Sequence, residues 1–202
     1  MDKEGIKEMN TGKFITAGAS LLAGAMLFTG CAGITHEPKV DVSSLADIDE
    51  DDFYKALKAI DIDEDDVAVM SDTFLSFESD DDEFEIIIDL TAESSNGNFY
   101  SYTQCADEAT AKALFEYYYQ DYKYVFDDKD FSGISSHEVG DDTAYVLIDG
   151  RLDNDILEEY TPYHDAIFLK GDVVIFAMAS DYEASIEKEV NVFLDALEYP
   201  HP

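Results

Sequence analysis

Three segments of the chain place apolar residues at the three- and four-residue spacing of one helix face. They are residues 53–60, 107–124 and 182–197. Acidic residues precede the first segment, and lysines occur later in it, as the helix dipole favours. Ser180-Asp181-Tyr182-Glu183 has the pattern of a capping box before the third. The pattern therefore predicts three helices.

Shorter runs of apolar residues, bounded by turn residues, are typical of strands. The run Ile86–Ile88 is continuously apolar, so we expect its strand to be central and covered on both faces. Residues 170–172 separate two apolar runs and predict a hairpin. A less regular stretch, residues 151–160, is interpreted as a short helix. The predicted strands span residues 67–77, 84–90, 99–105, 134–139, 143–148, 166–169 and 173–179.

The order of these elements predicts a single α+β domain over residues 47–202. We expect an antiparallel sheet with helices mainly on one face. A hairpin, a strand and an acid-capped helix around residues 84–124 resemble a hairpin and helix around residues 144–197. One hypothesis is that these are two related units, which would place both of their helices on the same face. A chance likeness is the alternative.

The first thirty residues differ from the rest of the chain. Phe14 to Gly30 has no charge, is rich in Ala, Gly and Leu, and is short for a membrane-spanning helix. It leads into Leu27-Phe28-Thr29-Gly30-Cys31, which resembles the lipobox of bacterial lipoproteins, although Phe28 replaces the usual Leu. The resemblance implies that residues 1–30 are a signal peptide. It also implies that Cys31 becomes the new N-terminus and receives a diacylglyceryl group.

The lipobox therefore predicts an envelope protein, anchored by lipid to the extracytoplasmic face of the cell membrane. Each buried methylene of the acyl chains on Cys31 contributes about 0.8 kcal/mol. Residues 31–46 are expected to hold the lipidated Cys31 and a flexible tether. Met9 would begin a shorter, basic leader and is our hypothesis for the initiator. The remaining chain resembles small uncharacterised lipoproteins of Gram-positive bacteria. This resemblance does not identify an activity.

The charge of the chain excludes one class of partner. There are 47 acidic and 12 basic residues, for a formal net charge of −35. Nucleic-acid binding needs clustered Lys and Arg, so we expect no nucleic acid. With Cys31 assigned to lipid, Cys105 has no partner for a disulfide and is predicted to be a small buried hydrophobe.

An acidic segment after the first predicted helix partly matches an EF-hand calcium loop. Asp61, Asp63 and Asp65 occupy loop positions 1, 3 and 5, and Asp72 occupies position 12. However, Asp66 stands where the loop needs Gly, and Asp72 stands where a bidentate Glu is usual. A calcium site at these four aspartates is one hypothesis, and an acidic helix-to-strand turn is the alternative. No other cofactor is expected.

The chain carries no strong catalytic motif. Neither Gly-x-Ser-x-Gly, a P-loop nor His-Glu-x-x-His is present. The histidines lack zinc-ligand spacing, and neighbouring residues of a strand face opposite ways. They are His36, His137, His164 and His201. An acidic pair such as Glu158-Glu159 could serve an envelope or polysaccharide hydrolase only in a cleft. We therefore expect a non-enzymatic protein, with such a hydrolase as the alternative.

Residues 117–124 contain five tyrosines. Tyr117 and Tyr124 are seven positions apart, two helical turns, so we expect them on one exposed stripe. Exposed tyrosines beside acidic residues suit a protein or glycan interface, whereas tyrosines at the edge of the core are the alternative. The sequence as a whole predicts a membrane-anchored binding module, with a calcium-responsive module as a further alternative.

Overall fold

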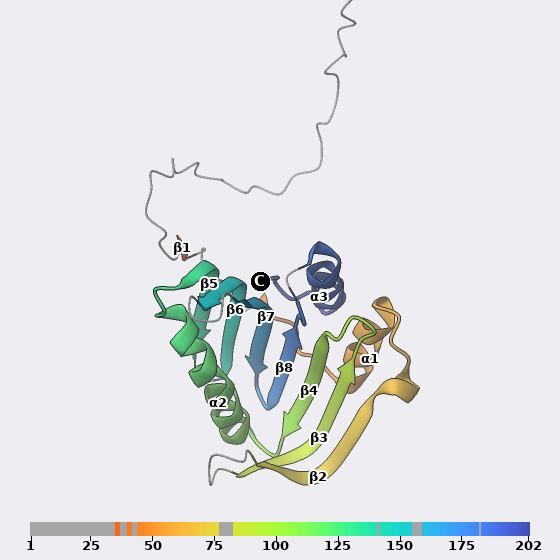
Figure 1. The fold of residues 1–202 in the computed structure, drawn as a ribbon. Helices are drawn as coiled ribbons and strands as arrows, with labels where there is room; N and C mark the ends of the chain where they lie inside the picture. Colours follow the sequence, from red (N-terminus) through yellow and green to blue (C-terminus); the bar gives the residue numbers. More distant parts are fainter. Residues whose placement is uncertain are drawn as a thin grey trace, which may run out of the picture. The chain divides into compact units, whose positions relative to one another are not determined.

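The described part of the chain forms an eight-stranded sheet with three α-helices (Figure 1). The computed structural model describes residues 35–36, 40–41, 44–76, 83–140, 142–154, 159–181 and 183–202. The strands are β1 (Thr35–His36), β2 (Ala68–Ser76), β3 (Glu83–Glu93), β4 (Phe99–Cys105), β5 (Phe131–Val139), β6 (Thr143–Asn154), β7 (Glu159–Lys170) and β8 (Val173–Met178). The helices are α1 (Glu50–Ala59), α2 (Glu108–Phe126) and α3 (Ala184–Ala196), with a 3-10 turn, η2, at Glu64–Asp66. Within these described ranges, no helix is long and apolar enough to cross a membrane.

The strands lie in the order β1-β5-β6-β7-β8-β4-β3-β2. Every neighbouring pair is antiparallel except β1 and β5, which confirms the α+β class and the antiparallel sheet. The hairpin predicted at residues 170–172 joins β7 and β8. The short helix predicted at residues 151–160 is wrong, because β6 and β7 pair as far as Asn154 opposite Glu159. There, pairing between two long strands outweighs a weak local helical preference.

The helices cover both faces of the sheet (Figure 1). Helices α1 and α3 share one face and one core cluster, whereas α2 packs in a second cluster on the other face. Buried hydrophobic residues alternate between the two faces of the sheet along β6, which explains why helices cover both faces. Ala144, Val146 and Ile148 belong to the α2 cluster, and Tyr145 and Leu147 belong to the other. Two of the three helices thus share a face, but α2 and α3, the helices of the two hypothetical related units, do not.

Acidic residues cap two of the helices as the sequence predicts. The Asp49 carboxylate accepts from the Asp52 N–H at 3.0 Å, and the Asp107 carboxylate accepts from the Thr110 N–H at 2.8 Å. The capping box predicted before α3 is wrong, because the Ser180 hydroxyl donates instead to a backbone carbonyl of the β3–β4 turn, and α3 begins at Ala184.

The prediction for the run Ile86–Ile88 is also wrong. Strand β3 is second from the edge of the sheet rather than central. Its pairing with β4 is irregular between Ile86 and Ile88. A bulge of this kind lets the side chain of the extra residue leave the alternating pattern, and Ile87 is 44 % exposed. Strand β2, beyond β3, forms the edge.

Candidate functional site

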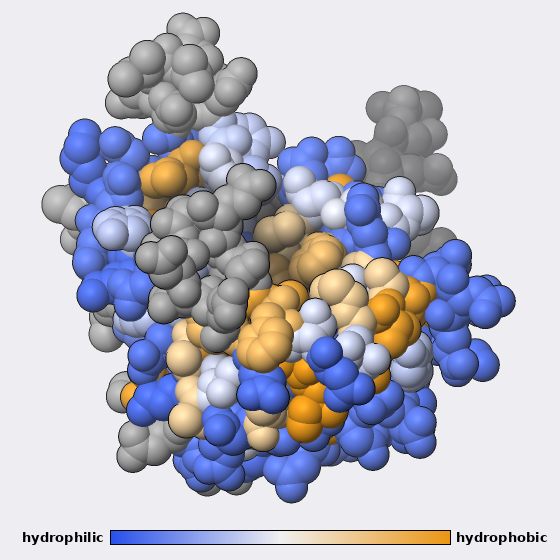
Figure 2. All heavy atoms as spheres, turned by 90° about the horizontal axis from the view of Figure 1, so that it is seen from below, coloured by the Kyte–Doolittle hydropathy of each residue, from blue (hydrophilic) through white to orange (hydrophobic). Residues whose placement is uncertain are grey.

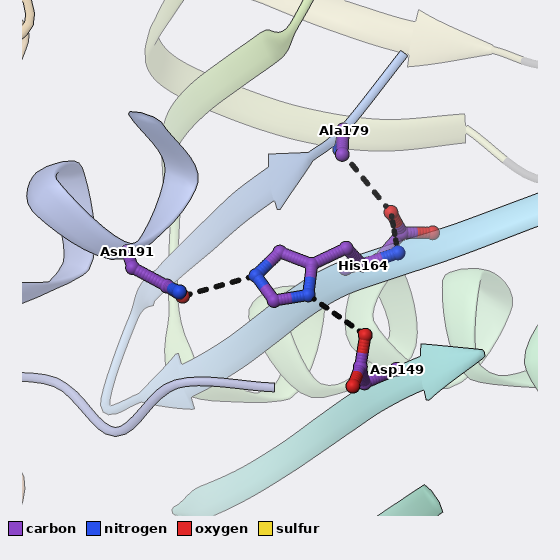
Figure 3. A network of polar contacts seen from close by, with 5 residues as sticks. Asp149, His164, Ala179 and Asn191 are labelled. Atoms are coloured by element: carbon purple, nitrogen blue, oxygen red, sulfur yellow. Dashed lines mark hydrogen bonds and ion pairs between the residues drawn. The ribbon is translucent and has the colours of Figure 1, made fainter. Parts of the chain in front are cut away.

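The central strand β7 buries two adjacent polar residues, His164 and Asp165, which are 5 % and 3 % exposed. Because they are neighbours in a strand, they face opposite sides of the sheet. The ring of His164 points toward α3, which carries Asn191 (Figure 3). The carboxylate of Asp165 bonds to Tyr122 of α2. The two residues therefore belong to separate polar sites.

The ring of His164 joins three elements of the fold. Its Nδ1 lies 3.0 Å from Oδ1 of Asp149, which is directly opposite on β6, and its Nε2 lies 3.0 Å from Oδ1 of Asn191 (Figure 3). Burial disfavours the charged ring, but the hydrogen bonds with Asp149 and Asn191 favour it more, so the pKa of His164 lies above its ordinary value. With both nitrogens bonded, the ring ties β6, β7 and α3 together and leaves no nitrogen for a substrate proton.

Asp165 accepts three hydrogen bonds on the α2 side of the sheet. Tyr122 donates its hydroxyl to Oδ2 at 2.8 Å, and the backbone N–H groups of His164 and Ala179 donate to Oδ1 at 3.3 Å each. Burial raises the pKa of Asp165 to about 7 despite these donors. A carboxyl group that changes charge near neutral pH in a cleft is a candidate for ligand recognition.

A cavity of about 320 Å³ lies between α2 and the strands β7 and β8. Asp165 is part of its lining, and Asp121 of α2 contributes a second carboxylate. Aromatic residues make up much of the rest: the rings of Tyr118 and Phe176 are 5.6 Å apart, and those of Tyr122 and Tyr163 are 6.2 Å apart. A largely apolar cavity with a few polar groups is the usual form of a small-ligand site.

The edge strand β2 and its neighbour β3 carry exposed hydrophobic side chains. Phe74 on β2 is 58 % exposed, and Val69, Met70 and Ile87 are also exposed. Seen from below, the side of the molecule where β2 and β3 lie in Figure 1, hydrophobic residues gather in one area flanked by hydrophilic ones (Figure 2). An exposed apolar area on an edge strand is uncommon and is a candidate interaction surface.

The four aspartates of the calcium hypothesis do not form one loop. Asp61 follows α1 with φ of +62°. Asp63 immediately precedes η2, Asp65 lies within it, and Asp72 lies in β2. An EF-hand needs positions 1 to 12 to curl around the ion, but here Ala68–Ser76 belong to strand β2. Among the described residues, no three His, Cys, Asp or Glu side chains are grouped so that they could hold a metal ion.

The tyrosines of α2 divide between surface and core. Tyr124 is 77 % exposed, as expected. Tyr117 is half-buried and packs edge-on against Phe84, with centroids 6.1 Å apart, and against Tyr118 at 6.0 Å. The expected single exposed stripe is therefore wrong for Tyr117, because the curled sheet brings Phe84 of β3 against this part of α2.

The remaining chemical candidates are separate from one another. Cys105 is buried, and burial raises the pKa of its thiol to about 12, so it remains protonated. The ring of His137 stacks on Phe126, and His201 pairs with Asp195 at 2.9 Å. His36 lies in β1. Cys31, the predicted lipid-attachment residue, lies outside the described residues, as do the leader and Glu158.

Sequence reasoning noticed His164 and Asp165 but not the cavity. The available signal was the polar triplet Tyr163-His164-Asp165 followed by the apolar residues of a central strand. Buried polar residues in such a strand need partners from both covering layers, and the pattern did not reveal these. No protein family matches the chain, and no curated protein or solved structure is significantly similar to it.

Proposed function

We propose that this protein is a lipid-anchored, extracytoplasmic interaction module without catalytic activity, which binds an extended basic segment of a partner protein along β2. The observation that carries the proposal is the exposed apolar edge formed by β2 and β3 (Figure 2). Natural edge strands are usually short, charged or covered, because their free N–H and C=O groups can pair with another chain. Strand β2 is nine residues long and, among the residues that the structure describes, pairs on one side only, with β3.

The geometry of an edge strand suits an extended partner. A segment added beside β2 would form main-chain hydrogen bonds, and its alternate side chains would contact exposed residues such as Phe74 and Val69. Main-chain pairing supplies affinity, and the apolar contacts supply specificity.

The charge around β2 favours a basic partner. Exposed acidic residues precede the strand at Asp63–Asp66, and Glu85 lies opposite Phe74 in the β2–β3 pairing. The net charge of −35 would repel an acidic partner and a second copy of the chain. A segment that alternates apolar and basic residues complements both features.

The membrane anchor is supported by the lipobox that ends at Cys31. Its test is metabolic labelling of the full-length protein with an alkyne fatty acid in a bacterial host. We expect label in the membrane fraction and none in Cys31→Ser. Labelling that persists in Cys31→Ser would contradict the anchor.

A designed peptide tests the interaction surface. The probe is a nine-residue peptide of alternating Val and Lys, and its control alternates Val and Glu. We expect saturable binding of the Lys peptide, with slower amide hydrogen exchange in β2. Phe74→Lys should weaken binding by about tenfold or more, because it places a charge in the apolar contact. Tyr124→Lys is the matched control, since it makes the same change at an exposed site on α2. Equal binding of both peptides, or equal loss in both variants, would contradict the proposal.

A further inference from the structure

The cavity between α2 and β7–β8 is distinct from the β2 edge and has its own chemistry. Its lining comes from α2, β7, β8 and Ala179, the residue that follows β8. Four aromatic residues contribute: Tyr118, Tyr122, Tyr163 and Phe176. Aromatic rings carry negative charge on their faces and attract a cation within about 6 Å of the ring centre. The walls therefore favour a ligand with a positive group and an apolar body.

The charged groups of the cavity all have one sign. Asp121 and Asp165 line it, and among the described residues that line it there is no Lys, Arg or His. Three hydrogen bonds reach Asp165, whereas two carboxylate oxygens can accept about four. An anionic ligand would meet two carboxylates without a compensating cation. A neutral ligand would gain no binding energy from the negative potential of the site.

We infer that this cavity binds a small organic cation, an alkylammonium whose charge lies among the tyrosine rings and near Asp165 and Asp121. The volume of about 320 Å³ is at the lower end of the range for small-ligand sites, so it suits a head group with a short substituent. The net charge of the chain also raises the local concentration of cations. This inference does not depend on the proposed role of β2.

Calorimetric titration of the full-length protein tests the inference. Choline is the probe, because its quaternary ammonium is permanently charged. The control ligand is 3,3-dimethyl-1-butanol, which has nearly the same shape and no charge. We expect choline to bind saturably. The neutral alcohol should bind at least about tenfold more weakly.

Three variants locate the binding. Asp165→Asn removes a carboxylate with little change in shape, and Tyr118→Leu removes a ring; each should weaken choline binding by about tenfold. Tyr124→Leu changes an exposed tyrosine of the same helix and should leave binding unchanged. Thermal unfolding of each variant checks that it is folded. The inference is overturned if choline does not bind, if the alcohol binds equally well, or if folded Asp165→Asn binds like the original protein.

Discussion

The two faces of β7 bury neighbouring polar residues in different surroundings. On the α3 face, His164 is held between Asp149 and Asn191, and this face carries a core cluster of aliphatic and aromatic residues. On the α2 face, Asp165 is equally buried but borders a cavity. A polar group whose partners are all protein groups fastens elements together, whereas one beside open space can also meet a ligand. The comparison predicts that the α3 face contributes more to stability and that the α2 face responds more to pH and ligands.

The largest difference should come from aromatic truncation on each face. Phe193 of α3 is fully buried, with its ring 4.5 Å from that of Tyr100 and 5.7 Å from that of Phe53. Phe193→Ala should lower the free energy of unfolding by about 3–5 kcal/mol. Phe176 is only partly buried beside the cavity, and Phe176→Ala should cost about 1–2 kcal/mol. Urea unfolding measures both values. Equal losses would remove the distinction between the faces.

An intermediate effect is expected from removing the ring of His164. His164→Leu keeps apolar volume but leaves Asp149 and Asn191 without their bonds to the ring, which should cost about 1–3 kcal/mol near pH 6. Because the folded pKa of His164 is raised above 6.5, its contribution is full below pH 6.5 and is lost as pH rises through the folded pKa. The cost of His164→Leu should therefore shrink at higher pH. Unfolding titrations across this range measure it, and a cost independent of pH would be evidence against a charged ring.

Near pH 4.5 the smallest effect is expected at Asp165, and it should grow with pH over a different window. Its folded pKa of about 7 lies above the ordinary 3.8, so its stabilising contribution is lost between pH 3.8 and about 7. Asp165→Asn resembles the protonated group, so it should match the original protein near pH 3, exceed its stability by about 1 kcal/mol near pH 4.5, and exceed it further as the pH rises to about 7. Melting temperatures of both proteins across the window provide the measurement. Parallel curves would show that Asp165 keeps one charge state throughout.

The sequence predicted the helices and most strands because each has a strong local pattern. The apolar stripe at Phe53 and Leu57 and the cap at Asp49 specify α1 without reference to the rest of the chain. The alternation around Val146 likewise indicated a strand. Residues 151–154 were assigned wrongly because their conformation is set by pairing with β7, which no local pattern encodes.

The candidate sites were harder to predict, because they depend on which face each helix covers. The bond between Tyr122 and Asp165 joins residues 43 positions apart, and it exists only because α2 crosses β7 on that face. The exposure of Ile87 depends on a local irregularity in pairing with β4. In contrast, the acidic pattern at Asp61 was visible in the sequence, but the chain geometry that would make it a calcium loop is not formed.

The strand order also places β1, the strand nearest in sequence to Cys31, and β2, the proposed partner site, at opposite edges of the sheet. Strand β1, which lies within the predicted tether, is at one edge, and β2 is at the other, seven strand spacings away. At about 4.8 Å per spacing, this is about 34 Å along the curved sheet. In a protein anchored through Cys31, a partner bound to β2 would be held at the edge of the sheet opposite β1. Residues 37–67, which include α1, also join β1 to β2 along the chain, so tension between partner and membrane would be shared between the strand ladders and the packing of α1 against α3.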